Sequence, residues 1–470
     1  MHQFQKLLGI TALSFITGHH AEGQKPNIIF ILADDLGWAD LPAYGHKSVI
    51  AHGGWTVYGE LKMPNLDRLA SEGTIFSQYY VNSGVSSPSR TGIMTGQFPG
   101  RLAIHDYIAD HELNLKRGMP DYLNPAVSTI TKLLKTGGYR TGHFGKWHLG
   151  SGNVSPKPEE YGIDIFKTCL DGPMKRVGST EMIADETIKF IEASGNNPFY
   201  INVWLYDPHS PLHPTEKMME PYKNLSPGWG DQKGALEVWY AVLSDIDRHV
   251  GRIMDKLDEL GLSKNTIVVF TSDNGPESGL FPFTSHYGGA SSTDTGPFRG
   301  IKRSLYEGGV REPFIVRWPG NTPAGKVDNA SVISGVDILP TFCDLAGIKL
   351  PRNVIFDGEN ISPVLKGTPT ERTKPLMWEN RFPVYGHTIH KSPILAIRLG
   401  DWKLLMNPDS DRVELYDISI DPTELNNCAG LKPDIVRDLS SQLLKWSSLL
   451  PEGPVDKDAG SNAYPWPQSR

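Results

Sequence analysis

Short apolar runs alternate with amphipathic segments along the chain as far as Trp318. The apolar runs cover residues 27–33, 139–144, 199–205, 266–271 and 313–318. Continuous runs of this length predict strands that are buried on both faces. Helical spacing occurs at 129–134, 180–193 and 235–260, with Ser128 as a possible N-cap of the first helix. Helices between buried strands predict an α/β fold with a mostly parallel sheet covered on both faces.

The last hundred residues follow a different pattern. Residues 396–406 and 413–418 resemble half-exposed strands of a meander, and 433–450 has the spacing of an amphipathic helix. We therefore predict a main domain over residues 24–374. A smaller C-terminal α+β subdomain, with an antiparallel sheet and a helix, is expected over 375–470.

The first 23 residues have the features of an export signal. Lys6 supplies a positive charge, residues 7–16 are mostly apolar, and Ala21 and Gly23 offer small side chains near a cleavage point. The sequence thus predicts a mature chain that begins near Gln24 and is exported, to the periplasm or the medium. An ordinary buried N-terminal segment is the alternative interpretation. No later apolar run reaches the roughly 20 residues of a membrane span.

Composition narrows the class of protein. The 470 residues include 46 Lys and Arg against 53 Asp and Glu, a net charge of −7, and 39% are hydrophobic. This balance is typical of a globular protein and argues against nucleic-acid binding, which normally needs clustered positive charge. The cysteines, Cys169, Cys343 and Cys428, allow at most one intramolecular disulfide and are too widely spaced for a zinc knuckle.

Polar side chains follow the predicted strands at their carboxyl ends. They are Asp34 and Asp35, Lys146 and His148, His209, and Asp273 and Asn274. Ligands of open α/β sheets bind beyond the carboxyl ends of the strands, so we expect one shared site.

Four of these side chains offer only oxygen atoms to a metal: Asp34, Asp35, Asp273 and Asn274. Such donors favour a hard cation, Ca²⁺ or Mg²⁺, over zinc. The alternative is that either pair only caps a helix or a turn, where Asp is common.

Residues 86–96 read SSPSRTGIMTG, with Pro88 near the first turn of a short predicted helix and Ser86 just ahead of it. A helix N-terminus favours negative charge, which gives weak support for anion binding. The segment resembles the type I sulfatase motif C/S-x-P-S-R-x-x-x-L/M-T-G. In that family the first residue, here Ser86, is converted to formylglycine. A serine at this position resembles the bacterial serine-type sulfatases, which depend on a serine-type sulfatase-maturing enzyme.

The resemblance extends over most of the chain. DDLGW at 34–38 and SDNG at 272–275 match the family's metal motifs, and GKWHLG at 145–150 matches its Lys and His segment. His209 follows Pro208 as in the family's P-H-x-P segment, and Lys302 precedes EGGVREP. The layout is similar to the arylsulfatase A and N-acetylgalactosamine-6-sulfatase group. This implies an alkaline-phosphatase-like fold and removal of O-sulfate from a carbohydrate.

The resemblance also implies a role for each motif residue. One Ca²⁺, with Mg²⁺ less expected, is held by Asp34, Asp35, Asp273, Asn274 and the modified Ser86. Arg90, Lys146 and Lys302 offset charge on the sulfuryl oxygens. His148 assists deprotonation of the hydrated aldehyde, and His209, helped by Lys302, protonates the departing alcohol. One hydroxyl of that gem-diol attacks sulfur, and the other expels sulfate.

Four further histidines in loops are candidates for the sugar pocket: His213, His286, His387 and His390. Isolated loop histidines more often serve as surface or hydrogen-bonding residues. Two other functions are considered. A phosphatase or phosphonate monoester hydrolase shares the expected fold but usually uses two metals, whereas this sequence has one evident metal cluster. A glycan-binding protein without turnover would require that Ser86 stays unmodified.

Overall fold

The computed structural model describes residues 25–45, 50–52, 55–57, 61–150, 155–168, 178–223, 225, 234–277 and 295–461. The predicted export signal, Cys169 and His286 lie outside these residues.

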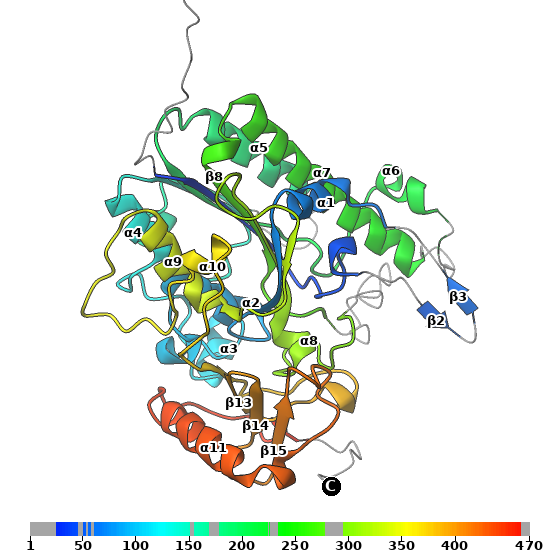
Figure 1. Ribbon diagram of the computed structural model, residues 1–470, viewed down its shortest axis with the longest axis vertical. Coiled ribbons are helices and arrows are strands. Elements are labelled where there is room, and N and C mark those ends of the chain that lie inside the picture. The colour runs from blue at the N-terminus through cyan, green and yellow to red at the C-terminus, as the bar shows by residue number, and fades with distance from the viewer. Residues whose placement is uncertain are drawn as a thin grey trace, which may run out of the picture.

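Within the described residues, nine strands form a mixed sheet in the order β10-β4-β9-β8-β1-β7-β5-β6, with β11 beside β4 (Figure 1). The central strand β1 runs parallel to β7 and β8, so that Ile29 lies opposite Ile201 and Val268. β9 runs antiparallel to both β8 and β4. The strands are β1 Asn27–Ala33, β4 Thr74–Tyr80, β5 Arg140–Gly145, β6 Ile165–Lys167, β7 Phe199–Trp204, β8 Thr266–Ser272, β9 Arg311–Arg317, β10 Lys326–Asp328 and β11 Ile333–Ser334.

Helices cover both faces of this sheet (Figure 1). One face carries α1 Pro64–Ser71, α5 Ser179–Glu192 and α7 Ala235–Glu259, and the other carries α2 Ser86–Thr95, α4 Ile130–Thr136, α9 Ile338–Leu345 and α10 Ser362–Leu365. Successive residues of β1 point to opposite faces, so Ile29 joins one core and Phe30 the other. An apolar run was therefore required, because neither face of the strand meets water.

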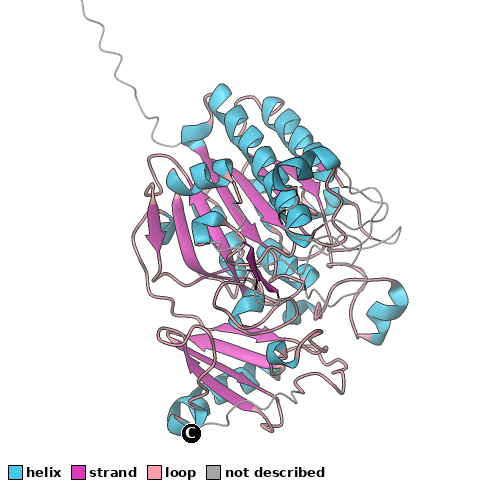
Figure 2. Cartoon of the chain, turned by 90° about the vertical axis from the view of Figure 1, so that its right-hand side faces the viewer, coloured by secondary structure: helices cyan, strands magenta, loops and turns pink. Residues whose placement is uncertain are grey.

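A second, four-stranded antiparallel sheet lies below the first (Figure 2). It consists of β12 Leu376–Glu379, β13 Leu395–Leu399, β14 Trp402–Met406 and β15 Val413–Asp417, and α11 Pro433–Ser447 packs against it. Its strands are mostly buried rather than half-exposed as expected, because Leu404 packs toward α11 while Leu405 packs toward the larger core. The remaining elements are β2 Ile50–His52, β3 Trp55–Val57, α3 His111–Lys116, α6 Glu216–Met219 and α8 Glu307–Val310.

Two local predictions are wrong. Thr129, not Ser128, caps α4, because its hydroxyl accepts a hydrogen bond from the Lys132 amide at 3.3 Å. Ser86 is the first residue of α2 rather than the residue ahead of it, and Val85 occupies the N-cap.

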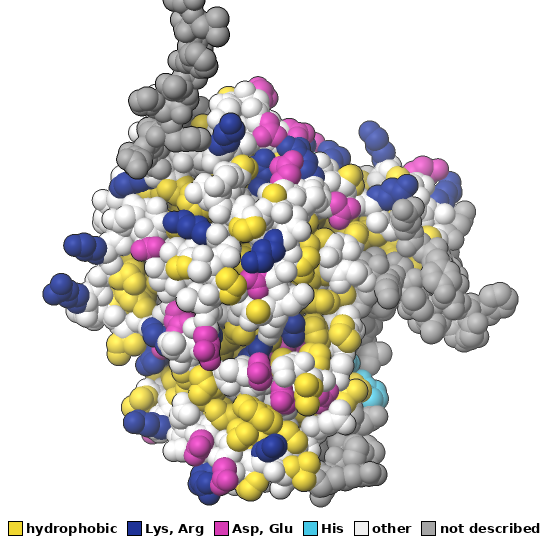
Figure 3. All heavy atoms as spheres, viewed as in Figure 1, with side chains coloured by type: hydrophobic (Ala, Val, Ile, Leu, Met, Phe, Trp, Pro, Cys, Tyr) yellow, Lys and Arg dark blue, Asp and Glu magenta, His cyan; other side chains and the backbone are white. Residues whose placement is uncertain are grey.

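Cys343 and Cys428 are free thiols. None of the described helices combines the length and apolar character needed to cross a bilayer. On the face drawn in Figure 3, side chains of both charges are interspersed.

Candidate active site

Three carboxylates meet where β1 and β8 end. Asp34 and Asp35 follow β1, and Asp273 follows the neighbouring β8. The Asp35 amide donates to Asp273 Oδ1 at 3.2 Å, and the Asp273 amide donates to the Ala33 carbonyl at 3.2 Å. Asp35 has a φ of 65°, a left-handed conformation that is costly for a residue other than glycine. All three side chains are buried.

Ser86 lies among these groups at the N-terminus of α2. Its Oγ is 3.2 Å from Asp34 Oδ1, 3.4 Å from Asn274 Oδ1 and 3.2 Å from Lys146 Nζ. Ser86 is itself buried and is the first residue of α2. The structure thus places the hydroxyl between a lysine and the two oxygen donors.

Each carboxylate is paired with a cation. Lys146 Nζ donates to Asp34 Oδ2 at 2.6 Å, and Lys302 Nζ donates to Asp35 Oδ2 at 2.6 Å. Arg90 donates from Nε and Nη2 to Asp273 Oδ2 at 3.0 and 2.7 Å.

The Arg90 side chain is completely buried, and its guanidinium lies 4.9 Å from the centre of the Trp204 ring. A buried arginine held in this way is fixed in position rather than free to follow solvent.

Burial and the surrounding charges shift the pKa of several of these groups. Burial raises the pKa of Asp34, but Lys146 and other cations outweigh it, so the pKa lies well below its usual range. Burial, together with Asp34 and Asp273, raises the pKa of Asp35 to about 6 despite Lys302. Burial lowers the pKa of Lys146, whereas Asp35 and Glu277 raise that of Lys302 against the effect of burial.

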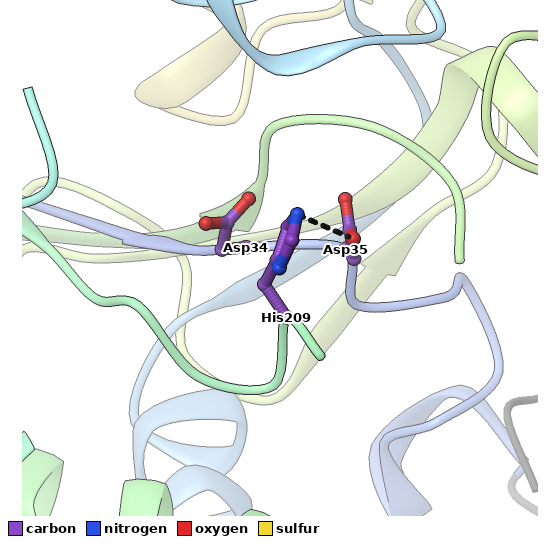
Figure 4. Close-up of side chains that lie close together, drawn as sticks. All are labelled: Asp34, Asp35 and His209. Carbon is purple, nitrogen blue, oxygen red and sulfur yellow. Dashed lines mark ion pairs between the residues drawn. The ribbon is translucent and has the colours of Figure 1, made fainter. Parts of the chain in front are cut away.

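The donor atoms fit a hard divalent cation. One ligand atom from each of Asp34, Asp35 and His209 lies within 4.8 Å of the others (Figure 4). Asn274 adds a carboxamide oxygen 3.4 Å from Ser86 Oγ, while its Nδ2 donates to Asp35 Oδ1 at 2.7 Å. Three carboxylates and an amide form the oxygen-rich set that Ca²⁺ or Mg²⁺ prefers. His209 was expected in the shared site but not among the residues that bind the metal.

Hydrogen bonds fix which nitrogen of His209 and His148 faces the site. His209 Nδ1 donates to the Ser210 carbonyl at 2.5 Å, which leaves Nε2 at 3.5 Å from Asp35 Oδ2. His148 Nε2 donates to the Ile108 carbonyl at 3.2 Å. Its buried Nδ1 has no hydrogen-bond partner among the described residues. Burial, followed by the charges of Lys146 and Arg90, holds the pKa of His148 well below its usual range, which favours the neutral form of this ring.

The other candidate histidines occupy different places. His213 lines a cavity of about 610 Å³ beside Asp207 and Pro211, in the loop that carries His209. His387 is exposed and caps a short helical turn at 388–390. His390 accepts a hydrogen bond from the Gly300 amide at 3.2 Å, so it supports the backbone near Lys302.

Four backbone groups of the loop that carries Lys302 are hydrogen-bonded to side chains beyond residue 375. Besides the bond to His390, Asn380 Nδ2 donates to the Arg303 carbonyl at 2.8 Å. The Leu305 amide donates to Ser392 Oγ at 2.9 Å, and the Glu307 amide donates to Glu424 Oε2 at 2.6 Å. The C-terminal region from Leu376 onward, which contains the four-stranded sheet, therefore helps to hold the segment that presents Lys302.

Two site residues were missed in the sequence. Glu277 Oε2 is 3.6 Å from Lys302 Nζ, and both Glu277 oxygens accept from Arg303 Nη1 at 3.1 Å. Their positions gave a signal, since Glu277 stands three residues after Asn274 and Arg303 directly follows Lys302.

Comparison with known proteins identifies the family. A family model described as sulfatase matches residues 26–348, and a second model, N-sulphoglucosamine sulphohydrolase, C-terminal, matches 298–448. The chain belongs to the sulfatase family. An N-acetylgalactosamine-6-O-sulfatase of Bacteroides thetaiotaomicron is 29% identical over 511 residues, covering 89% of this chain and 93% of the relative. Arylsulfatase A of Homo sapiens is 30% identical over 494 residues, covering 90% and 88%.

A solved structure shows the same architecture. The crystal structure of Ps i-CgsB in complex with k-i-k-neocarrahexaose is 27% identical, with a TM-score of 0.74, and the match covers 92% of this sulfatase and 96% of that chain. The alkaline-phosphatase-like fold expected from the sequence is thereby confirmed, as is the resemblance to arylsulfatase A and the N-acetylgalactosamine-6-sulfatases. The protein is a sulfuric ester hydrolase.

Proposed function

We propose that this sulfatase removes O-sulfate from a carbohydrate, using formylglycine formed from Ser86 and one bound Ca²⁺. The observation that carries the proposal is the position of Ser86 Oγ, within 3.4 Å of Asp34, Asn274 and Lys146 at the start of α2. Carbohydrate as the substrate class is supported by two relatives, an N-acetylgalactosamine-6-O-sulfatase and a protein crystallised with a neocarrahexaose.

The modified residue and the cation supply chemistry that serine alone lacks. A hydrated aldehyde offers one hydroxyl for attack on sulfur and a second whose deprotonation expels sulfate. Asp34, Asp35, Asp273 and Asn274 would hold the cation, which would lower the pKa of a hydroxyl of residue 86 and offset charge on the sulfate. The same donors suit Mg²⁺ less well because that ion demands a stricter octahedral geometry.

The protein's own side chains carry the proton transfers and the charge. Lys146 and Arg90 face the nucleophile and offset negative charge that develops on the sulfuryl oxygens. His148, neutral and with Nδ1 unprotonated, accepts a proton from residue 86 when sulfate is expelled.

The departing alcohol leaves on the side of His209 and Lys302. The bond from Nδ1 to Ser210 fixes Nε2 as the atom that faces the site, from which a proton passes to the leaving oxygen. Lys302, held between Asp35 and Glu277, keeps its charge beside it.

Export and maturation belong to the same proposal. Residues 1–23 carry the chain to the periplasm or the medium, and a serine-type maturing enzyme modifies Ser86. Ser86 is only 2% exposed in the folded protein, so that enzyme has to meet the chain before α2 is packed.

The test is mass spectrometry of protein made in its native host or with a serine-type maturing enzyme. Loss of two hydrogens at Ser86, within the tryptic peptide 69–90, is expected. Sulfate release from N-acetylgalactosamine 6-sulfate and from sulfated oligosaccharides is then compared with hydrolysis of phosphate esters.

Ser86→Ala removes the residue to be modified and should abolish sulfate release. Ser87→Ala is the matched control and should keep the activity, because Ser87 is adjacent but its Oγ accepts a hydrogen bond from the Ile108 amide instead. An unmodified Ser86 in native protein, or faster hydrolysis of phosphate esters, contradicts the proposal.

A further inference from the structure

Arg303 is strained where it passes the nucleophile. Its φ of 75° is left-handed, a conformation that is unfavourable for a residue other than glycine. Its amide donates to the Gly84 carbonyl at 2.7 Å, two residues before Ser86, and its Nη1 is held by both oxygens of the buried Glu277. The chain therefore maintains an unfavourable conformation to fix this guanidinium beside the site.

The guanidinium of Arg303 supports an exposed aromatic ring. It lies 4.8 Å from the centre of the Tyr385 ring, close enough for a cation–π contact. Tyr385 is 43% exposed, so part of its ring is open to solvent. Asn380, on the same segment, donates to the Arg303 carbonyl and ties the segment to the site.

The same arrangement occurs beside His148. The Tyr107 ring lies 6.4 Å from the His148 ring, and Arg117 lies 4.3 Å from Tyr107 and 5.2 Å from Phe382. Arg117 is held by Asp106 at 3.2 Å, as Arg303 is held by Glu277.

These five residues, Tyr107, Arg117, Arg303, Phe382 and Tyr385, form what we call the arginine–aromatic rim. The rim begins at Tyr107, which lies beside His148, and ends at Arg303, which follows Lys302.

We propose that the arginine–aromatic rim is the sugar-binding wall of the site, with Tyr385 stacking on a pyranose ring of the sulfated glycan. Each rim arginine is balanced by a buried carboxylate, so the rim adds a rigid apolar surface rather than net positive charge. A tyrosine ring suits a sugar because it offers an apolar face together with a polar edge. The inference rests on the proposed function, since it takes a sulfated glycan as the ligand.

The experiment separates sugar binding from sulfate binding. Tyr385→Ala and Tyr385→Phe are compared with wild type for KM and kcat on neocarrahexaose and on N-acetylgalactosamine 6-sulfate, and for competitive inhibition by inorganic sulfate. Tyr385→Ala is expected to raise KM about five- to tenfold with kcat nearly unchanged. Tyr385→Phe, which keeps the ring, stays within about twofold of wild type. Inhibition by inorganic sulfate, which has no ring, stays unchanged in both variants.

Calorimetry gives a reading that does not depend on turnover. In the Ser86→Ala background, Tyr385→Ala is expected to weaken binding of the same saccharides by the same factor. Leu260→Ala, a change at an exposed side chain where α7 ends and on the opposite side of the sheet from the carboxyl ends of the strands, is the control.

An unchanged KM and affinity, or equal losses in saccharide and sulfate binding, overturns the proposal. Saccharides that bind through Tyr385 but are not hydrolysed by matured wild type support the rim and contradict the proposed reaction instead.

Discussion

His143 is a buried, uncharged histidine beneath the site, and it makes the protein sensitive to acid. It lies on β5, three residues before Lys146, with ring centres 5.0 to 5.3 Å from those of Trp147, Phe166 and Trp204. Neither ring nitrogen has a hydrogen-bond partner among the described residues. Burial, followed by the nearby charge of Arg90, lowers the pKa of His143 to about 3.

The sign of the effect follows from this lowered pKa. Below pH 6.5 the unfolded chain takes up a proton on this ring, whereas the folded chain does not until about pH 3. Stability is therefore complete above pH 6.5 and falls by about 1.4 kcal/mol per pH unit as the pH decreases. Between pH 6.5 and 4.5 the loss from this single group is about 2 kcal/mol.

His143→Phe removes the titration and keeps an aromatic ring among its neighbours. Urea unfolding is followed by tryptophan fluorescence at several pH values from 7.5 to 4.5. We expect the free energy of unfolding of the variant to fall by about 2–3 kcal/mol less than that of wild type over this range, whatever the offset between them at pH 7.5. His111→Gln, at an exposed histidine paired with Asp121, is the control and should not reduce the loss. Parallel pH curves for wild type and His143→Phe would refute the reasoning.

Other predictions concern the ion pairs and the metal. Lys403 Nζ lies 2.8 Å from Glu307 Oε1 and 3.0 Å from Glu424 Oε1, and all three side chains are buried. Lys403→Met removes the cation that these two carboxylates share, so the free energy of unfolding measured in urea should fall by about 3–5 kcal/mol. Lys189→Met, at an exposed pair, should cost less than about 1 kcal/mol. Arg90→Lys keeps the positive charge but loses the planar guanidinium with its paired donors. The value of kcat/KM for sulfate release should therefore fall about 10²- to 10³-fold, whereas the variant should remain folded with a cooperative thermal transition. Chelation should abolish activity, with Ca²⁺ restoring more of it than Mg²⁺; full activity in chelator contradicts the metal role.

Local sequence predicted the strands that are buried on both faces of the sheet. The apolar runs of β1 and β8 allow little except burial on both faces, and their carboxyl ends then bring Asp34 and Asp273 together. β4 was missed because polar residues interrupt its run TIFSQYY, although most of them are covered in the fold. The antiparallel direction of β9 was not predictable, since direction depends on the path of the connecting chain rather than on composition.

Local sequence could not reveal contacts between distant segments. Ser128 and Thr129 are both good capping residues, and only the packing of α4 selects the second. Arg303 and Tyr385 are 82 positions apart and share no motif, so their contact emerges only when the two subdomains are assembled.

Four hydrogen bonds join the C-terminal region to the backbone of the Lys302 loop, and they affect how an active sulfatase should be recognised from its gene. A gene fragment that stops before residue 375 would still encode every motif from DDLGW to EGGVREP. The protein made from it would lack Asn380, His390, Ser392 and Glu424, which fix the position of that loop. An inventory of motifs would count such a fragment as an enzyme, although the loop that carries its lysine would have lost these four hydrogen bonds. Completeness of the last hundred residues is therefore a sounder criterion for an active member than the presence of the motifs.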